Sequence, residues 1–174
     1  MVTDLISKAR QIRLVVTDVD GVLTDTGVYY SAGGEEMKRF SIRDGMGVER
    51  LRQHGIEVAI VTGENSESVR RRAEKLNIRE LHLGVSEKKT VLVTLSSRKN
   101  IPLDDIAYIG DDTNDLGAMA IAGLTACPAD ATEFASRAAH LVTRARGGHG
   151  AFREFAEYII AAKQSSQTGG HDEK

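Results

Sequence analysis

The chain has 174 residues, of which 41% are hydrophobic and 28% are charged, a composition typical of one globular domain. Its formal net charge of −2 argues against nucleic acid or an anionic membrane surface as the main partner. The single cysteine, Cys127, excludes an internal disulfide, and the sequence has neither an apolar stretch of membrane-spanning length nor a signal-peptide pattern. We therefore expect a cytoplasmic protein.

Short apolar runs alternate with amphipathic segments, which predicts strands separated by helices. The expected strands are Ile12 to Val16, the hairpin arms Gly27 to Ser31 and Met37 to Ile42, then Ile56 to Val61, Leu81 to Leu83, Ile106 to Ile109, Leu124 to Ala126 and His140 to Val142. The expected helices are Asp44 to His54, Ser66 to Leu76, Ser86 to Arg98, Leu116 to Ile121, Thr132 to Arg137, and a terminal helix that follows the glycine cluster Gly147 to Gly150 and ends at about Ala162.

Strands connected through helices pair in parallel with right-handed crossovers. We therefore expect a single α/β domain over residues 1–163, a doubly wound, Rossmann-like parallel sheet with a protruding hairpin. The polar, glycine-containing residues 164–174 predict a disordered tail. In sheets of this kind, function gathers at the carboxyl ends of the strands.

Polar side chains follow the predicted strands at four such ends, at Asp18, Asp20, Thr62 and Asp111. Paired carboxylates at the end of a parallel strand suit a divalent metal with oxygen ligands, or a nucleophile with a general acid as partner. An isolated acidic turn is the simpler interpretation of the first pair. The coincidence of all these positions favours a functional site.

Phosphate-ester cleavage is the chemistry that fits these residues. The reacting phosphorus is shielded by negative oxygens, so an attacking carboxylate needs positive charge nearby. Mg²⁺ held by Asp18 and Asp111, together with Lys88, would provide it. The Thr62 hydroxyl can bind a phosphate oxygen, and Asp20 can protonate the departing alcohol and then activate water.

Each position also has a structural alternative. Thr62 fits a strand-to-helix turn, and Lys88 fits a solvated helix face. The acidic group of Asp111, Asp112 and Asp115 fits helix capping. Carboxylates so close in sequence repel one another unless a cation is present, so we favour the metal interpretation.

The motifs resemble, in order, those of the haloacid dehalogenase superfamily of phosphohydrolases. They are Asp18-Val-Asp20-Gly-Val-Leu-Thr24, then Thr62, Lys88, and Gly110-Asp111-Asp112-Thr-Asn-Asp115. The resemblance implies that Asp18 is the nucleophile and Asp20 the acid and base. It also implies that Mg²⁺ is held by Asp18, the Asp20 carbonyl and Asp111, with Asp112 and Asp115 as supporting carboxylates.

The intervals between motifs leave no room for a cap domain of ~50 residues or more. Among capless members, the chain resembles the 3-deoxy-D-manno-octulosonate 8-phosphate phosphatases over nearly its whole length, including the segments that begin at Phe40 and Gly147. The resemblance implies a homotetramer built around the hairpins, a sugar-acid phosphate as substrate, and a role in lipopolysaccharide biosynthesis.

One segment departs from that pattern. Octulosonate phosphatases usually have Thr-Gly-Arg where this chain has Thr62-Gly63-Glu64. With Lys75, this segment resembles phosphatases of nine-carbon keto-deoxy acid 9-phosphates, so the choice between eight and nine carbons stays open. A non-catalytic regulatory module with the same fold also stays open. The candidate substrate-binding residues are Gly63, Glu64, Asp44, Arg43 and Lys75, with Arg144 and Arg153 as further candidates for the sugar carboxylate.

Overall fold

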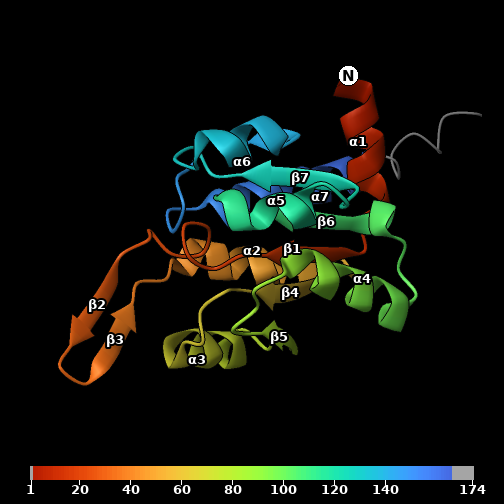
Figure 1. Cartoon of the computed structure of the whole chain (residues 1–174). Helices are drawn as coiled ribbons and strands as arrows, with labels where there is room; N and C mark the ends of the chain where they lie inside the picture. Colours follow the sequence, from red (N-terminus) through yellow and green to blue (C-terminus); the bar gives the residue numbers. More distant parts are fainter. Residues whose placement is uncertain (1, 166–174) are drawn as a thin grey trace, which may run out of the picture.

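A computed structural model describes residues 2–165 and shows a central sheet with helices on both faces (Figure 1). Within these residues the sheet has six parallel strands in the order β5-β4-β1-β6-β7-β8. The strands are β1 (Leu14–Thr17), β4 (Glu57–Val61), β5 (Glu80–His82), β6 (Ile106–Ile109), β7 (Leu124–Cys127) and β8 (Leu141–Val142). The helices are α1 (Val2–Gln11), α2 (Ile42–Gln53), α3 (Glu67–Lys75), α4 (Lys88–Lys99), α5 (Leu116–Met119), α6 (Glu133–Ala138) and α7 (Ala151–Gln164), with short 3-10 helices η1 (Leu103–Asp105) and η2 (Thr113–Asp115).

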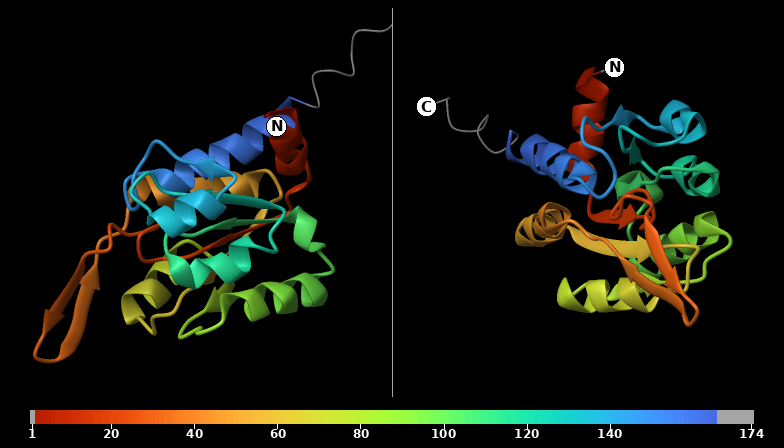
Figure 2. Two further views of the ribbon diagram at one scale, coloured as in Figure 1. Left: turned by 45° about the horizontal axis from the view of Figure 1, so that its top comes forward. Right: turned by 90° about the vertical axis from the view of Figure 1, so that its left-hand side faces the viewer.

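Side chains of the buried strands alternate between two hydrophobic cores. Val15 and Ile60 belong to the core beneath α1, α2, α3 and α7. Leu14, Val16 and Tyr108 belong to the core beneath α4, α5 and α6 on the other face. The two layers of helices lie on opposite sides of the sheet in Figure 2. This alternation follows from the period of two in a strand and confirms the predicted doubly wound sheet.

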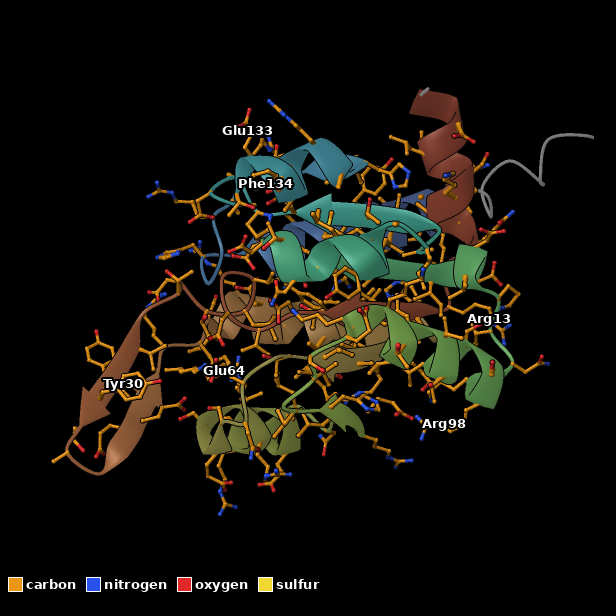
Figure 3. All side chains as sticks on the ribbon, viewed as in Figure 1. Arg13, Tyr30, Glu64, Arg98, Glu133 and Phe134 are labelled. Atoms are coloured by element: carbon orange, nitrogen blue, oxygen red, sulfur yellow. The ribbon has the colours of Figure 1, made fainter. Side chains whose placement is uncertain are left out.

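A separate antiparallel hairpin, β2 (Val28–Ser31) and β3 (Gly34–Lys38), projects away from the sheet (Figure 1). Three of its apolar side chains, Tyr29, Tyr30 and Met37, are each more than half exposed. Figure 3 shows Tyr30 on the outer part of this hairpin. Large apolar side chains gathered on a projecting element form a surface suited to contact with another chain.

Several predicted boundaries are wrong. No element was predicted before the first strand, but α1 precedes it. The first strand was predicted to begin at Ile12, but β1 begins at Leu14, and Ile12 packs in the hydrophobic core before it. The second hairpin arm begins at Gly34, earlier than expected, which shortens the turn. The helix after the hairpin is capped by Ser41, whose hydroxyl accepts backbone N–H bonds, and not by Asp44.

Two further helix limits differ from prediction. The helix expected from Ser86 begins at Lys88, with Glu87 as its N-cap. The last helix continues to Gln164, past both Ala162 and the expected domain boundary at residue 163. Most of the predicted tail, residues 166–174, lies outside the described residues.

Asp44 instead caps a different helix. Its side chain is buried in α2, and its two oxygens accept hydrogen bonds from the backbone N–H groups of Gly150, at 3.1 Å, and Arg153, at 3.0 Å. These groups lie in the first turn of α7, whose own N-cap, Gly150, offers no side-chain oxygen. Since unpaired N–H groups at a helix start are unfavourable, Asp44 replaces the missing cap from another part of the chain.

Replacing Asp44 by alanine is expected to lower the free energy of unfolding by about 2 kcal/mol, because one buried and one part-buried backbone donor lose their acceptor. Urea denaturation of the metal-free protein measures the loss. Glu49→Ala, on the same helix, is the control, because Glu49 forms a part-exposed ion pair with Arg52 that contributes little. An equal loss in both variants would show that Asp44 does not cap α7.

Candidate active site

The carboxyl ends of β1, β4 and β6 border a cavity of about 270 Å³. Figure 3 shows Glu64 at this end of the sheet, nearest the hairpin, with Arg13 and Arg98 at the opposite end. The cavity is lined by Asp18, Asp20, Thr26, Thr62, Gly63, Glu64, Asp111, Asp112, Thr113 and Asn114. The convergence predicted for the strand-end residues is therefore present in the fold.

Asp18 follows β1 directly, and its backbone continues the hydrogen bonding between β1 and β6. Its backbone N–H donates to the carbonyl of Ile109 in β6 at 3.0 Å. The carboxylate is only 4% exposed, and its Oδ1 lies 2.9 Å from Nζ of Lys88. Burial raises the pKa of Asp18 to about 7, the negative charge of Asp115 adds to the rise, and the ammonium of Lys88 opposes it.

Asp115 is fully buried and is satisfied by four donors. Its Oδ1 accepts from Nζ of Lys88 at 2.7 Å and from the Tyr108 hydroxyl at 2.5 Å. Its Oδ2 accepts the backbone N–H groups of Asp111, at 2.9 Å, and Asp112, at 3.1 Å. These bonds close the turn after β6 and fix Lys88 between Asp115 and Asp18.

Asp112 caps η2, since its side chain accepts the N–H of Thr113 at 2.6 Å. The Asp115 side chain accepts the N–H of Asp112 in return, so the capping interpretation is confirmed for two members of the acidic group. Asp112 also lines the cavity, so the two roles are compatible.

The carboxylate of Asp111, unlike that of Asp115, lacks hydrogen-bond donors among the described residues. It accepts no hydrogen bond from any residue in the range 2–165. Burial raises its pKa to about 8, and the charges of Asp18, Asp115 and Asp112 add to the rise. The charge of Lys88 opposes this rise only in part, so a half-buried carboxylate without a hydrogen-bond donor leaves the site with an excess of negative charge.

Oxygen atoms of Asp18, Asp111 and Asp115 lie within 4.8 Å of one another. Gly21 permits this approach, because a Cβ there would lie 1.9 Å from Oδ2 of Asp111, and its φ of +86° favours glycine. Because Asp115 is already saturated, Asp18 and Asp111 are the side chains that fit a cation. A set of oxygen donors with excess negative charge fits Mg²⁺.

Asp20 lines the cavity but turns its carboxylate toward the base of the hairpin. Its two oxygens accept from Nζ of Lys38 at 2.8 and 2.6 Å, and the Thr24 hydroxyl donates to Oδ1 at 3.3 Å. Lys38 was not predicted as part of the site. It lies eighteen residues from Asp20 on a separate strand, so no local sequence signal connects the two.

Among the candidate substrate-binding residues, only Gly63 and Glu64 line the cavity. They follow β4 beside Thr62, which is buried and accepts the N–H of Glu64 at 3.4 Å. Arg43 is exposed on α2, and Lys75 is exposed at the far end of α3.

The remaining candidates also lie outside the cavity lining. Asp44 caps α7, as described above, and Arg144 and Arg153 form ion pairs with Glu154 and Glu157. Three lining residues were not predicted from the sequence, namely Thr26, Thr113 and Asn114. Thr113 and Asn114 lie inside the acidic motif, whereas Thr26 belongs to no motif.

A model of haloacid dehalogenase-like hydrolases matches residues 81–154, which include Lys88 and the acidic turn after β6. The chain is 41% identical to the 3-deoxy-D-manno-octulosonate 8-phosphate phosphatase of Haemophilus influenzae, over 91% of this chain and 88% of that protein. It is 40% identical to the phosphatase of the same description from Escherichia coli K12, over 92% of this chain and 85% of that protein.

Solved structures agree with these relatives. The Yersinia pestis 3-deoxy-D-manno-octulosonate 8-phosphate phosphatase superposes with a TM-score of 0.90 at 40% identity, covering 94% of this chain and 89% of that one. The Moraxella catarrhalis phosphatase, described as a complex with a magnesium ion, a phosphate ion and KDO, gives 0.91 at 37% identity, covering 97% of both chains. The chain therefore belongs to the haloacid dehalogenase-like hydrolases and, among them, to the 3-deoxy-D-manno-octulosonate 8-phosphate phosphatase family.

The resemblance to the haloacid dehalogenase superfamily that the sequence motifs indicated is thereby confirmed.

No helix within residues 2–165 is long and apolar enough to cross a membrane.

Proposed function

We propose that this protein is a Mg²⁺-dependent phosphatase that hydrolyses the phosphate monoester of 3-deoxy-D-manno-octulosonate 8-phosphate. The observation that carries the proposal is the convergence of Asp18, Lys88 and Asp111 at one cavity, in a chain 41% identical to such a phosphatase. The Moraxella catarrhalis relative holds magnesium, phosphate and the sugar acid together, which supports the same combination here.

Asp18 attacks phosphorus, and its carboxylate becomes the aspartyl-phosphate. Lys88 lies 2.9 Å from Asp18 and keeps that carboxylate ionised and oriented toward the cavity. Mg²⁺, held by Asp18, the Asp20 carbonyl and Asp111, would neutralise charge on the phosphate oxygens. Asp20 protonates the departing alcohol and then takes a proton from the water that hydrolyses the aspartyl-phosphate.

The loop after β4 binds the rest of the phosphate and the sugar. The Thr62 hydroxyl donates to a phosphate oxygen, and Gly63 and Glu64 border the substrate, because all three residues line the cavity. Arg43 and Lys75 are exposed in a single chain, so a role in substrate binding would require contacts outside this cavity.

The direct test is phosphate release by the purified protein with Mg²⁺ from the eight-carbon and nine-carbon keto-deoxy acid phosphates. We expect a higher kcat/KM for the eight-carbon substrate than for the nine-carbon one. Hydrolysis of neither compound, nor of any other sugar phosphate in a panel, would contradict the proposal and favour the regulatory module.

A nine-carbon substrate is the second candidate, and the position of Glu64 favours it. This acid lines the cavity at the position where octulosonate phosphatases usually have arginine. A carboxylate accepts hydrogen bonds from sugar hydroxyls, and a nine-carbon keto-deoxy acid has one hydroxyl more than the eight-carbon acid. A higher kcat/KM for the nine-carbon phosphate than for the eight-carbon one would decide for this candidate.

Mg²⁺ affinity is expected to fall between pH 8 and pH 6. In the metal-free protein the pKa values of Asp18 and Asp111 are raised to about 7 and about 8, so both carboxyls take up protons over this range. Mg²⁺ needs the ionised forms and must displace these protons, which weakens binding by up to about tenfold per pH unit for each proton. Calorimetric titration at the two pH values measures the change, and equal affinities would contradict these pKa values.

We also propose that the protein acts as a single domain and a homotetramer in the cytoplasm. The exposed hairpin residues Tyr29, Tyr30 and Met37 support contact between chains. Sedimentation analysis of the purified protein tests the assembly.

A further inference from the structure

The hairpin contributes one buried charge to the active site. Lys38 is the last residue of β3, and its side chain is only 1% exposed. Its ammonium donates to both oxygens of Asp20, at 2.8 and 2.6 Å, and lies 3.8 Å from Oε2 of Glu35. Burying an ammonium is unfavourable without close anionic partners, so these two carboxylates fix the position of Lys38.

The contacts continue beyond Lys38. Glu35 also accepts a hydrogen bond from the hydroxyl of Ser66, the N-cap of α3. Ser66 follows the Thr62-Gly63-Glu64 loop by two residues. A chain of polar contacts therefore connects Asp20, through Lys38 and Glu35 of β3, to the N-cap of the helix that follows the Thr62-Gly63-Glu64 loop.

Lys38 itself does not line the cavity, whereas Asp20 does. A substrate in the cavity can therefore contact Asp20 but not Lys38. Two-point contact with the ammonium restricts rotation of the carboxyl group, and the Thr24 hydroxyl at 3.3 Å restricts it further. Any influence of Lys38 on the reaction must pass through Asp20.

We propose that Lys38 is a positioning residue that holds Asp20 in the orientation needed to protonate the leaving alcohol. This inference rests on the proposed function. For the first step Asp20 must carry a proton: the bond from Asp18 to phosphorus forms, the bond from phosphorus to the alcohol oxygen breaks, and that oxygen takes the proton. Asp20 is left as the carboxylate, the form whose two oxygens accept from Lys38. A badly oriented Asp20 impairs this step when the leaving oxygen needs a proton.

The test compares leaving groups. A sugar alcohol needs a proton to leave, whereas p-nitrophenolate is stable as an anion. We expect Lys38→Met to lower kcat/KM for the sugar phosphate at least about tenfold more than for p-nitrophenyl phosphate. The ratio kcat/KM reports the steps through phosphoryl transfer to Asp18, so later hydrolysis of the aspartyl-phosphate does not mask the effect. Asp20→Asn should show the same selectivity and serves as the reference.

Lys99→Met is the matched control. Lys99 also bridges two carboxylates, Glu57 at 2.6 Å and Glu80 at 3.1 Å, but at the opposite end of the sheet. Both substrates should keep their kcat/KM within about twofold in this variant. If Lys38→Met does not fold, Lys38→Arg keeps a positive charge in a different geometry and should show a smaller loss with the same selectivity.

Equal losses on the two substrates, or no loss on either, would overturn the positioning role. The comparison requires only one alkyl and one aryl phosphate, so any sugar phosphate that the parent protein hydrolyses can be used. Failure of the parent protein to hydrolyse the octulosonate phosphate would count against the proposed function, whereas an unselective Lys38→Met variant would count against this inference alone.

Discussion

Replacing Asp18 by asparagine is expected to reduce kcat by about 10⁴-fold or more, because an amide oxygen cannot form the aspartyl-phosphate. The same change should not weaken the metal-free fold at pH 8. Burial raises the pKa of Asp18 to about 7, so the ionised group is destabilising in the folded state above that pH. Steady-state assays with Mg²⁺, and thermal melting with a chelator present, measure the two effects.

Asp104→Asn is the control for this change, since Asp104 is an exposed acid in η1 at the opposite end of the sheet. It should keep kcat within about twofold. An Asp18→Asn variant with more than about a tenth of the parent activity would contradict the role of Asp18 as nucleophile.

Replacing Lys88 by methionine is expected to eliminate measurable activity and to lower the free energy of unfolding by about 3–5 kcal/mol. Lys88 is 1% exposed and donates to Asp18 at 2.9 Å and Asp115 at 2.7 Å. Methionine has a similar volume, so the loss reflects the uncompensated carboxylates and not a cavity. Chemical denaturation and phosphate-release assays measure the two effects.

The pH dependence of the stability loss in Lys88→Met distinguishes uncompensated carboxylates from a packing defect as its cause. Lys88 lowers the pKa of Asp18, so its loss raises that pKa further. A carboxyl group with a raised pKa in the folded state destabilises the fold progressively as pH rises toward that pKa. The loss in Lys88→Met should therefore be larger at pH 8 than at pH 5. Lys89→Met, which alters an exposed residue of the same helix, should show no such dependence.

Strand-end residues were the part of the site that the sequence predicted well. Asp18, Thr62 and Asp111 each follow an uninterrupted apolar run, and parallel pairing of β1 with β4 and β6 brings them to one edge. Lys88 was also placed correctly, at the start of a helix after a strand. These positions depend only on the order and direction of the elements, which the alternation of patterns determines.

The errors concern contacts between elements distant in sequence. Asp44 was expected to cap its own helix, yet it binds N–H groups more than a hundred residues away. The ion pair of Lys38 with Asp20 depends on the path of the hairpin back to the sheet. Neither contact has a local pattern, because each depends on tertiary packing.

Lys75 illustrates a different limit. It is the last residue of α3, the helix after the loop that borders the cavity, and it was predicted to bind substrate because of the resemblance to the nine-carbon phosphatases. The helix runs from Glu67 to Lys75, so its two ends lie roughly 12 Å apart. Helix length, which the sequence predicted approximately, therefore already argues against placing Lys75 at the same cavity edge as Glu64.

Chemical trapping of the covalent intermediate shows which aspartate attacks phosphorus. The protein is mixed with Mg²⁺ and substrate, quenched in acid within one turnover, and reduced with borohydride, which converts an aspartyl-phosphate into homoserine. Peptide mass spectrometry should then find homoserine at position 18 alone. Homoserine at another aspartate, or none while phosphate is released, would contradict the account.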